Sequence, residues 1–250
     1  MTRFATSKNA LQQNNDEVTA LNLKRRVVVT GVGLVTPLGV GIENVWSAIL
    51  DGQSGIGPLT RFDTSKPECR IAGAVKGFKA DEYVAPKEIK KMDLFIQYAL
   101  GASKIALDDS GLDMSKEDGE RIGVVVGTGL GGLPTIEKYH SVLLERGPDR
   151  ITPFFIPMLI ANLAPGHIAI QHGLKGPNLC IVTACATGAH SIGEGYRIIQ
   201  YGDADAIVAG GTEANITPQT VGGFNAMKAQ STRNEEPQKA TSPIHMDRDG

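Results

Sequence analysis

Uninterrupted runs of β-branched and aliphatic residues recur along the chain, and each ends at glycine, proline or charged residues. Such runs are typical of strands that are buried on both faces of a parallel sheet, where no side chain meets water. They predict four strands, over residues 25–39, 121–127, 179–183 and 204–211.

Between these runs, apolar residues fall at the spacing of an amphipathic helix. The first predicted helix lies in "IENVWSAILDG" and ends at Gly52, with an apolar stripe formed by Val45, Trp46, Ile49 and Leu50. Three more helices are predicted over residues 86–110, 133–147 and 185–202. Residues 53–85, rich in Gly, Pro and charge, predict irregular structure. Alternating strands and helices indicate an α/β protein with a largely parallel sheet.

The composition narrows the function without identifying it. The 250 residues are 41% hydrophobic, enough for a real core, and a net charge of −2 gives no reason to expect nucleic acid as a partner. The longest apolar run, residues 154–164, contains a proline and is too short to span a bilayer, so we expect no membrane insertion. Three cysteines are an odd number in a chain too long to need disulfides, and no secretory leader is recognisable. Both features favour the reducing cytoplasm.

The first 24 residues are polar, rich in Asn and Gln, and carry no stable apolar stripe. We therefore expect residues 1–24 to form a mobile extension. An organelle transit peptide is the alternative, but such peptides are poor in acidic residues, and Asp16 and Glu17 count against it.

"GTGLGG" at residues 127–132 matches the glycine pattern of a dinucleotide-binding turn. That reading requires a further strand ending in an acidic residue about 20 positions on. The segment found there, "GPDRITPFFIP", is not such a strand. The pattern therefore favours a tight backbone turn beside a pocket over a nucleotide site.

Cys185 follows the predicted strand 179–183 and begins a helix of small residues. The dipole and free N–H groups of a helix start stabilise a thiolate, and they can also hold an oxyanion when that thiolate attacks a carbonyl. A free cysteine is otherwise among the most buried residue types, so a plain core position is the alternative. The core position is the better reading for Cys180 inside the strand, and Cys69 reads as an incidental loop thiol.

A cysteine nucleophile usually works with a base. None of the five histidines has a spacing that marks it as that base, and none predicts a metal site; they are His140, His167, His172, His190 and His245.

Several motifs in order then resemble one family from Arg25 to Gly250: "RRVVVTGVGLVTPLG", "VVVGTGLGGL", "TPFFIP", "GPNLCIVTACATGAHSIG", "YGDADAIVAGGTEA", "GGFNAMKAQSTRN" and "DRDG". They are similar to the β-ketoacyl-[acyl carrier protein] synthases, above all the type II elongating enzymes of bacterial fatty acid synthesis. The resemblance identifies Cys185 as the position of the acyl-accepting nucleophile.

The resemblance implies a thiolase-like fold of two similar α/β halves in five αβαβα layers, of which residues 25–250 would supply the N-terminal half and the start of the second half's insertions. It implies a decarboxylative Claisen condensation. The Cys185 thiolate takes an acyl chain from acyl carrier protein, and the enolate from malonyl carrier protein then attacks that thioester. No metal or redox cofactor is implied, and the expected partners are acyl carrier protein and a second copy of the chain.

Further positions carry over from the family. Leu130 matches a residue that crosses the dimer interface to shape the partner's acyl pocket, and Phe155 and Phe224 match aromatics that line the pocket. Basic positions that meet the acidic carrier protein are matched by Lys90, Lys91 and Lys228. The alternatives are solvated surface lysines and ordinary core phenylalanines.

The sequence also departs from the family pattern. Pro165 replaces a small residue and is expected to kink its segment, and the residues before "DRDG" differ at Ser242, Ile244 and His245. Family members are longer, and their second half supplies two catalytic histidines, a lysine and a second oxyanion donor. We therefore expect this chain to be the N-terminal part of a synthase, with its activity alone in doubt. The alternatives are a non-catalytic chain-length subunit of a polyketide system, which Cys185 disfavours, and an inactive fragment.

Overall fold

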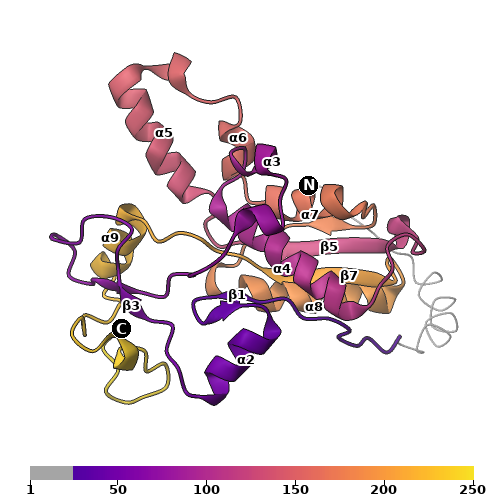
Figure 1. The fold of residues 1–250 in the computed structure, drawn as a ribbon, viewed down its shortest axis with the longest axis horizontal. Helices are drawn as coiled ribbons and strands as arrows, with labels where there is room; N and C mark the ends of the chain where they lie inside the picture. Colours follow the sequence, from indigo (N-terminus) through magenta and orange to yellow (C-terminus); the bar gives the residue numbers. More distant parts are fainter. Residues whose placement is uncertain (1–24) are drawn as a thin grey trace, which may run out of the picture.

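A three-stranded parallel sheet lies at the centre of the fold (Figure 1). The computed structural model describes residues 25–250, so the extension expected over residues 1–24 lies outside the described residues. The strand order is β6 (Asn178–Leu179), β5 (Ile122–Gly127), β7 (Ala206–Gly211). All six residues of β5 pair with β7, whereas only Val124 and Val125 pair with β6.

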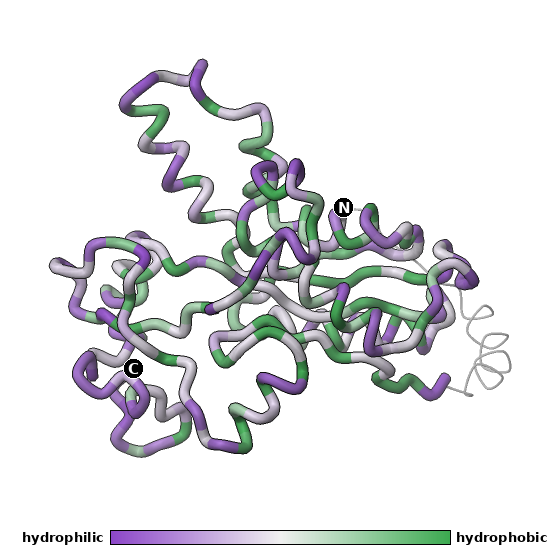
Figure 2. Tube along the Cα trace, in the orientation of Figure 1, coloured by the Kyte–Doolittle hydropathy of each residue, from purple (hydrophilic) through white to green (hydrophobic). Residues whose placement is uncertain are grey.

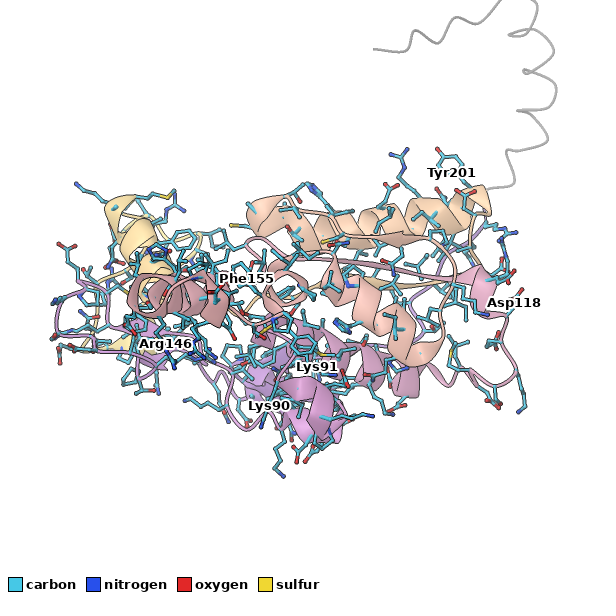
Figure 3. All side chains as sticks on the ribbon, turned by 90° about the horizontal axis from the view of Figure 1, so that it is seen from above. Lys90, Lys91, Asp118, Arg146, Phe155 and Tyr201 are labelled. Atoms are coloured by element: carbon cyan, nitrogen blue, oxygen red, sulfur yellow. The ribbon has the colours of Figure 1, made fainter. Side chains whose placement is uncertain are left out.

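Helices cover both faces of this sheet and give three layers (Figure 3). On one face, α4 (Leu94–Ser110) and α7 (Leu163–His172) pack together. The opposite face is covered by α8 (Thr187–Tyr201). Successive residues of β5 serve the two faces in turn: Val124 and Val126 join the α4–α7 core, while Val125 packs with residues of the α8 side. Because β5 is buried on both faces, its sequence is apolar without interruption.

The remaining elements surround this core. Helix α2 (Ile42–Leu50) follows a hairpin of β1 (Val35–Thr36) and β2 (Gly39–Val40), and β3 (Gly57–Pro58) pairs with β4 (Ile71–Ala72). An arm of α5 (Leu133–Arg146) and α6 (Phe155–Leu159) projects from the body, and α3 (Pro86–Ile89) and α9 (Pro218–Ala226) complete the helices described (Figure 1). The 3-10 turns are Ala80–Glu82, Gly119–Arg121, Pro148–Arg150, Ala184–Ala186 and Pro237–Lys239. Figure 2 shows the hydrophobic residues concentrated along the central strands, and hydrophilic residues predominating in the C-terminal coil.

Most of the predicted elements are confirmed to within a few residues. These are the strands β5 and β7, the helices α2, α5 and α8, and the largely irregular segment 53–85. The helix predicted over residues 86–110 is instead two helices. Asp93 divides them, because its side chain caps α4 by accepting a hydrogen bond from the N–H of Phe95.

The prediction of a buried strand over residues 25–39 was wrong. Only the short hairpin β1–β2 forms there, and Val28 and Val29 are exposed. The preceding residues run along α4 instead of pairing with a strand. A Cβ on Gly33 would lie 1.8 Å from the carbonyl oxygen of Ala102, and the N–H of Val32 donates to Asp109 at 2.9 Å. An apolar run shows that a segment can enter a sheet, but not which neighbour is available to pair with it.

The strand predicted over residues 179–183 is also shorter than expected. Only Leu179 of that range pairs with β5. Beyond it, the N–H of Thr183 is bonded to Oγ1 of Thr187 at 2.9 Å, so the chain turns away from the sheet toward Cys185. The predicted helix 185–202 accordingly begins two residues late, at Thr187, after a 3-10 turn.

Helix α2 is confirmed, but its predicted apolar stripe is not its buried side. Val45 and Ala48 are buried, whereas the other members of the stripe, Trp46, Ile49 and Leu50, are exposed in the described part of the chain.

Helices α6 and α7 were not predicted, because both contain proline. Pro165 is the third residue of α7, where the N–H of an ordinary residue has no partner within the helix. The helix continues through Pro165 to His172, and the kink expected at this proline stays a prediction.

Candidate active site

Three turns meet at the carboxyl edge of the sheet, one after each parallel strand. They are residues 127–132 after β5, residues 180–186 after β6 and residues 211–215 after β7. Their backbones are in direct contact: a Cβ on Gly127 would lie 2.0 Å from the carbonyl oxygen of Ile181. Glycine is therefore required at position 127 for the first two turns to approach each other.

Cys185 lies in the second of these turns and is exposed. It occupies the middle of the 3-10 turn Ala184–Ala186, two residues before α8 begins. Ala184 has a φ of 52°, in the left-handed region that residues with a Cβ rarely adopt. The turn thus places the thiol at the N-terminal end of a 15-residue helix, where the helix dipole favours an anion. The alternative of a buried core cysteine does not hold in the described structure.

A small hydrogen-bonded network fixes the residues around this turn. Oγ1 of Thr187 accepts a hydrogen bond from the N–H of Thr183, and Oγ1 of Thr183 lies 2.7 Å from Nδ1 of His190. From the sequence, no spacing marked His190 as a partner of Cys185. The spacing of residues 183, 187 and 190 could have indicated the network, because these positions share one side of a helix and the turn before it. The network holds the backbone just before Cys185.

The glycine turn is occupied by a carboxylate of this chain. Glu213, which follows β7, accepts hydrogen bonds from the N–H groups of Gly129 (2.8 Å) and Leu130 (3.2 Å). Burial raises the pKa of the Glu213 carboxyl above its usual value, although the hydrogen bonds from Thr128 and the turn act in the opposite direction. N–H groups that a nucleotide phosphate would need already serve Glu213. The chemistry of the turn therefore agrees with the sequence-based preference against a dinucleotide site.

Leu130 and Phe155 lie on segments that are joined to each other. Leu130 is half exposed at the tip of the glycine turn. The N–H of Gly132 donates to the carbonyl oxygen of Leu159 at 3.0 Å, which ties the turn to α6. Phe155, labelled in Figure 3, begins α6. Its ring packs edge-to-face on that of Tyr139, with the centroids 5.5 Å apart. The structure therefore places Leu130, Phe155 and Cys185 on connected segments.

The lysines differ in how they are held. Lys90 is exposed, whereas Nζ of Lys91 lies 2.9 Å from Glu88 and 5.3 Å from the ring centroid of Phe154 (Figure 3). Lys228 follows α9 and is exposed, with a φ of 54°.

Phe224, on α9, is 39% exposed. Within residues 25–250, neither Phe224 nor Lys228 makes a side-chain hydrogen bond, ion pair or ring stack that joins it to the Cys185 turn.

The other cysteines are less accessible than Cys185. Cys69, interpreted from the sequence as an incidental loop thiol, is buried and donates to the carbonyl oxygen of Ile71 at 3.4 Å. Burial raises the pKa of the Cys180 thiol. In the described part of the chain, no three His, Cys, Asp or Glu side chains are grouped as metal ligands. No helix among residues 25–250 combines the length and apolar character needed to cross a membrane.

Comparison with known proteins gives one consistent family. The family model described as "Beta-ketoacyl synthase, N-terminal domain" matches residues 24–250. The chain is 53% identical over 227 residues to 3-oxoacyl-[acyl-carrier-protein] synthase 2 of Vibrio cholerae, and 49% identical to the protein of that name from Coxiella burnetii. Each alignment covers 91% of this chain and 55% of the relative, so the chain spans about half the length of these relatives.

Solved structures agree with this match. A β-ketoacyl synthase from Burkholderia phymatum superimposes with a TM-score of 0.79 at 28% identity, over 90% of this chain and 56% of that protein. The ishigamide ketosynthase/chain length factor gives a TM-score of 0.74 at 30% identity, over 82% of this chain and 51% of that chain. The expected thiolase-like α/β fold is confirmed, and the described residues form three of its layers.

Proposed function

The chain belongs to the β-ketoacyl synthase family, and we propose on that premise that the whole protein is a 3-oxoacyl-[acyl-carrier-protein] synthase that elongates fatty acyl chains. The observation that carries the proposal is the exposed Cys185 at the start of α8, in a chain 53% identical to such a synthase. The turn gives the thiol access to a substrate, and the helix start favours its anionic form.

The first stage is an acyl transfer to Cys185. The thiolate attacks the carbonyl carbon of the acyl thioester on the carrier protein. The bond from that carbon to the carrier's sulfur breaks, and the carrier leaves as a thiolate, which takes up the proton that the Cys185 thiol had lost. The N-terminal end of α8 suits this step, because its N–H dipoles stabilise both a thiolate and the negative oxygen of the tetrahedral intermediate.

The second stage joins two carbons to the chain. The bond between the malonyl carboxylate and its neighbouring carbon breaks, CO₂ leaves, and the electron pair forms an enolate. The enolate carbon attacks the Cys185 thioester, and the Cys185 thiolate leaves. Decarboxylation itself supplies the carbanion, so the proposal names no metal or redox cofactor. The family resemblance assigns help with decarboxylation to two histidines, and a structural and catalytic role to a lysine, all in the second half of family members.

We assign the acyl chain to a pocket lined by Phe155 and Phe224 of one subunit and shaped across the dimer interface by Leu130 of the partner subunit, as the family resemblance implies. One hydrogen bond, from the N–H of Gly132 to Leu159, joins the turn of Leu130 to α6, which carries Phe155, and the glycine turn also contacts the turn of Cys185; both observations support Leu130 and Phe155. Phe224 rests on the family resemblance alone.

We assign the docking of the acidic carrier protein to Lys90, Lys91 and Lys228. Lys91 already forms an ion pair with Glu88, and it would have to break that pair to bind the carrier protein. Lys90 and Lys228 are exposed and form no ion pair within the described residues, which makes them the better contacts.

We also propose that the whole protein is a homodimer of the cytoplasm. Strand β6 is at the edge of the sheet among the described residues, and Leu179 and Val182 beside that edge are exposed. An unpaired strand edge with apolar neighbours is suited to pairing with a second copy. The three free cysteines fit a reducing compartment.

The test is transfer of a labelled acyl chain from acyl carrier protein to the full-length protein, followed by peptide mass spectrometry. We expect the label on Cys185, its loss in Cys185→Ala, and its retention in the matched control Cys180→Ala. Label that persists in Cys185→Ala would contradict the proposal.

A second measurement separates the alternatives. Malonyl carrier protein is added to the acylated protein, and release of CO₂ is followed. A complete synthase releases CO₂ and an elongated product. A protein that is acylated but releases none is an inactive fragment, and one that accepts no acyl chain is a non-catalytic subunit.

A further inference from the structure

The carboxylate of Glu213 binds the glycine turn at several points. Its Oε2 accepts hydrogen bonds from the backbone N–H groups of Gly129 and Leu130, at 2.8 and 3.2 Å. Its Oε1 accepts a bond of 3.0 Å from Oγ1 of Thr128, and a further bond from the side-chain amide of Asn215. One side chain that follows β7 thus accepts hydrogen bonds from three consecutive residues that follow β5.

The partners of this carboxylate are neutral. Within residues 25–250, Glu213 forms no ion pair, although burial disfavours its charge. A carboxylate is suited to this position because it offers two oxygens that only accept hydrogen bonds. Glutamine has nearly the same shape, but it offers one oxygen and turns an NH₂ group toward N–H groups that need an acceptor.

The contacts reach the rest of the turn through Thr128. Its hydroxyl donates to Glu213 and accepts a hydrogen bond from the N–H of Gly131 at 3.2 Å. Thr128 is 1% exposed, so water does not replace these bonds. Leu130 lies between the bonded groups, and because its own side chain is half exposed, hydrogen bonds rather than packing fix its place.

The same turn faces the nucleophile. A Cβ on Gly129 would lie 2.7 Å from Oε2 of Glu213 and 3.8 Å from Cα of Ala184, the residue before Cys185. The Glu213 carboxylate therefore sets how the tip of the glycine turn, with Leu130, stands beside the thiol.

We propose that Glu213 is a positioning residue that selects acyl chain length: by holding the backbone of residues 128–130, it fixes Leu130, the residue that the family resemblance assigns to the acyl pocket across the dimer interface. The inference rests on the proposed function, because it concerns the substrate of the same thiol. Glu213 touches neither the substrate nor the thiol, and its effect passes through the turn.

The experiment measures acylation of Cys185 in the full-length protein with carrier protein that bears short, medium or long saturated chains. We expect Glu213→Gln to change the ratio of kcat/KM between long and short chains by about tenfold, the effect of losing one well-placed pocket contact. Alkylation of Cys185 by iodoacetamide should stay close to wild type, because that reagent has no acyl chain. A purely structural loss would slow all chain lengths alike and leave the ratio unchanged.

A second pair of variants decides the matter if Glu213→Gln does not fold. Thr128→Val keeps the volume and removes the hydroxyl, whereas Thr128→Ser keeps the hydroxyl. We expect the chain-length ratio to shift in Thr128→Val and to stay near wild type in Thr128→Ser. If the wild-type protein takes no acyl chain, the proposed function fails. If wild type is acylated and the folded variants keep its ratio, the role of Glu213 is wrong.

Discussion

The two faces of the central sheet are built differently (Figure 3). On the α4–α7 face, large apolar side chains are completely buried, among them Phe95, Leu100 and Ile168. On the α8 face, the buried cluster is much smaller and centres on Val125 and Ile198. The outer side of α8 leaves Ile192 and Tyr196 exposed in the described part of the chain.

Helix α8 packs on the sheet through small residues, whereas α4 packs on it through large apolar side chains. Ser191 is fully buried on the inner side of α8, and a Cβ on Gly195 would lie 2.9 Å from Cγ2 of Ile207 on β7. Such contacts bury little apolar area, but they bring the helix backbone close to the strands. The first face therefore supplies most of the folding free energy, and the second places the start of α8, with Cys185, beside the other two turns.

The strongest way to break this comparison is to remove a large side chain from each face. Phe95→Ala should lower the free energy of unfolding by about 3–5 kcal/mol, because it leaves a cavity in the fully buried core on the α4–α7 face. The matched change Ile198→Ala, in the smaller cluster of the α8 face, should lower it less, by about 2 kcal/mol, because fewer side chains surround the cavity that it leaves. Urea unfolding followed by circular dichroism measures both. Equal losses would show that the two faces contribute alike.

The second way uses two glycines of the same helix. Gly195→Ala should destabilise the protein by about 1–3 kcal/mol, because the added methyl group meets Ile207 and Ala209 of β7. In Gly193→Ala the new methyl group meets nothing within 4 Å, so better helix propensity should stabilise the protein by about 0.5–1 kcal/mol.

Thermal unfolding shows whether each of the two variants is stabilised or destabilised. The rate at which iodoacetamide alkylates Cys185 reports the position of the turn that carries this cysteine. We expect this rate to change in Gly195→Ala alone. A stabilised Gly195→Ala protein would mean that α8 is not held closely to the sheet.

The same contrast explains how much the sequence could predict. Strands β5 and β7 were found because each is an apolar run of six paired residues, although only β5 is buried throughout and β7 is half-buried. The run at residues 25–34 looks alike but lies along α4, since apolarity does not reveal whether a partner strand is present. Helices α6 and α7 were hidden by Pro157 and Pro165, which local pattern treats as breaks.

The candidate site was predictable only where its signal is local. Cys185 could be singled out because strand, thiol and helix follow one another within a few residues. Glu213 could not, because its hydrogen bonds join residues 83 to 85 positions apart. The path of the backbone between β7 and the glycine turn decides this contact, and no sequence spacing encodes it. The same holds for Asp93, whose side chain caps α4 and also accepts hydrogen bonds from the N–H and hydroxyl of Thr135 on α5.

The smallest expected effect is a loss of stability at low pH, and it too should arise on one face of the sheet. Helix α7, on the α4–α7 face of the sheet, carries His167 and His172. Burial lowers the pKa of both imidazoles below the ordinary value. Glu88 opposes this shift at His167; at His172, Lys104 adds to the lowering and Asp108 opposes it. Since the folded state favours the neutral rings, their contribution to stability is complete above the unfolded pKa of about 6.5 and is lost as the pH falls below it.

We therefore expect the melting temperature to fall by a few degrees between about pH 7.5 and about pH 5.5, where unfolded histidines gain protons more readily than folded ones. The double variant His167→Gln, His172→Gln should show a smaller fall over the same interval, whatever its stability at the higher pH. Differential scanning calorimetry of the two proteins measures this. If the melting temperature of the double variant falls as far as that of wild type, the acid sensitivity does not arise from the histidines of α7 on the α4–α7 face.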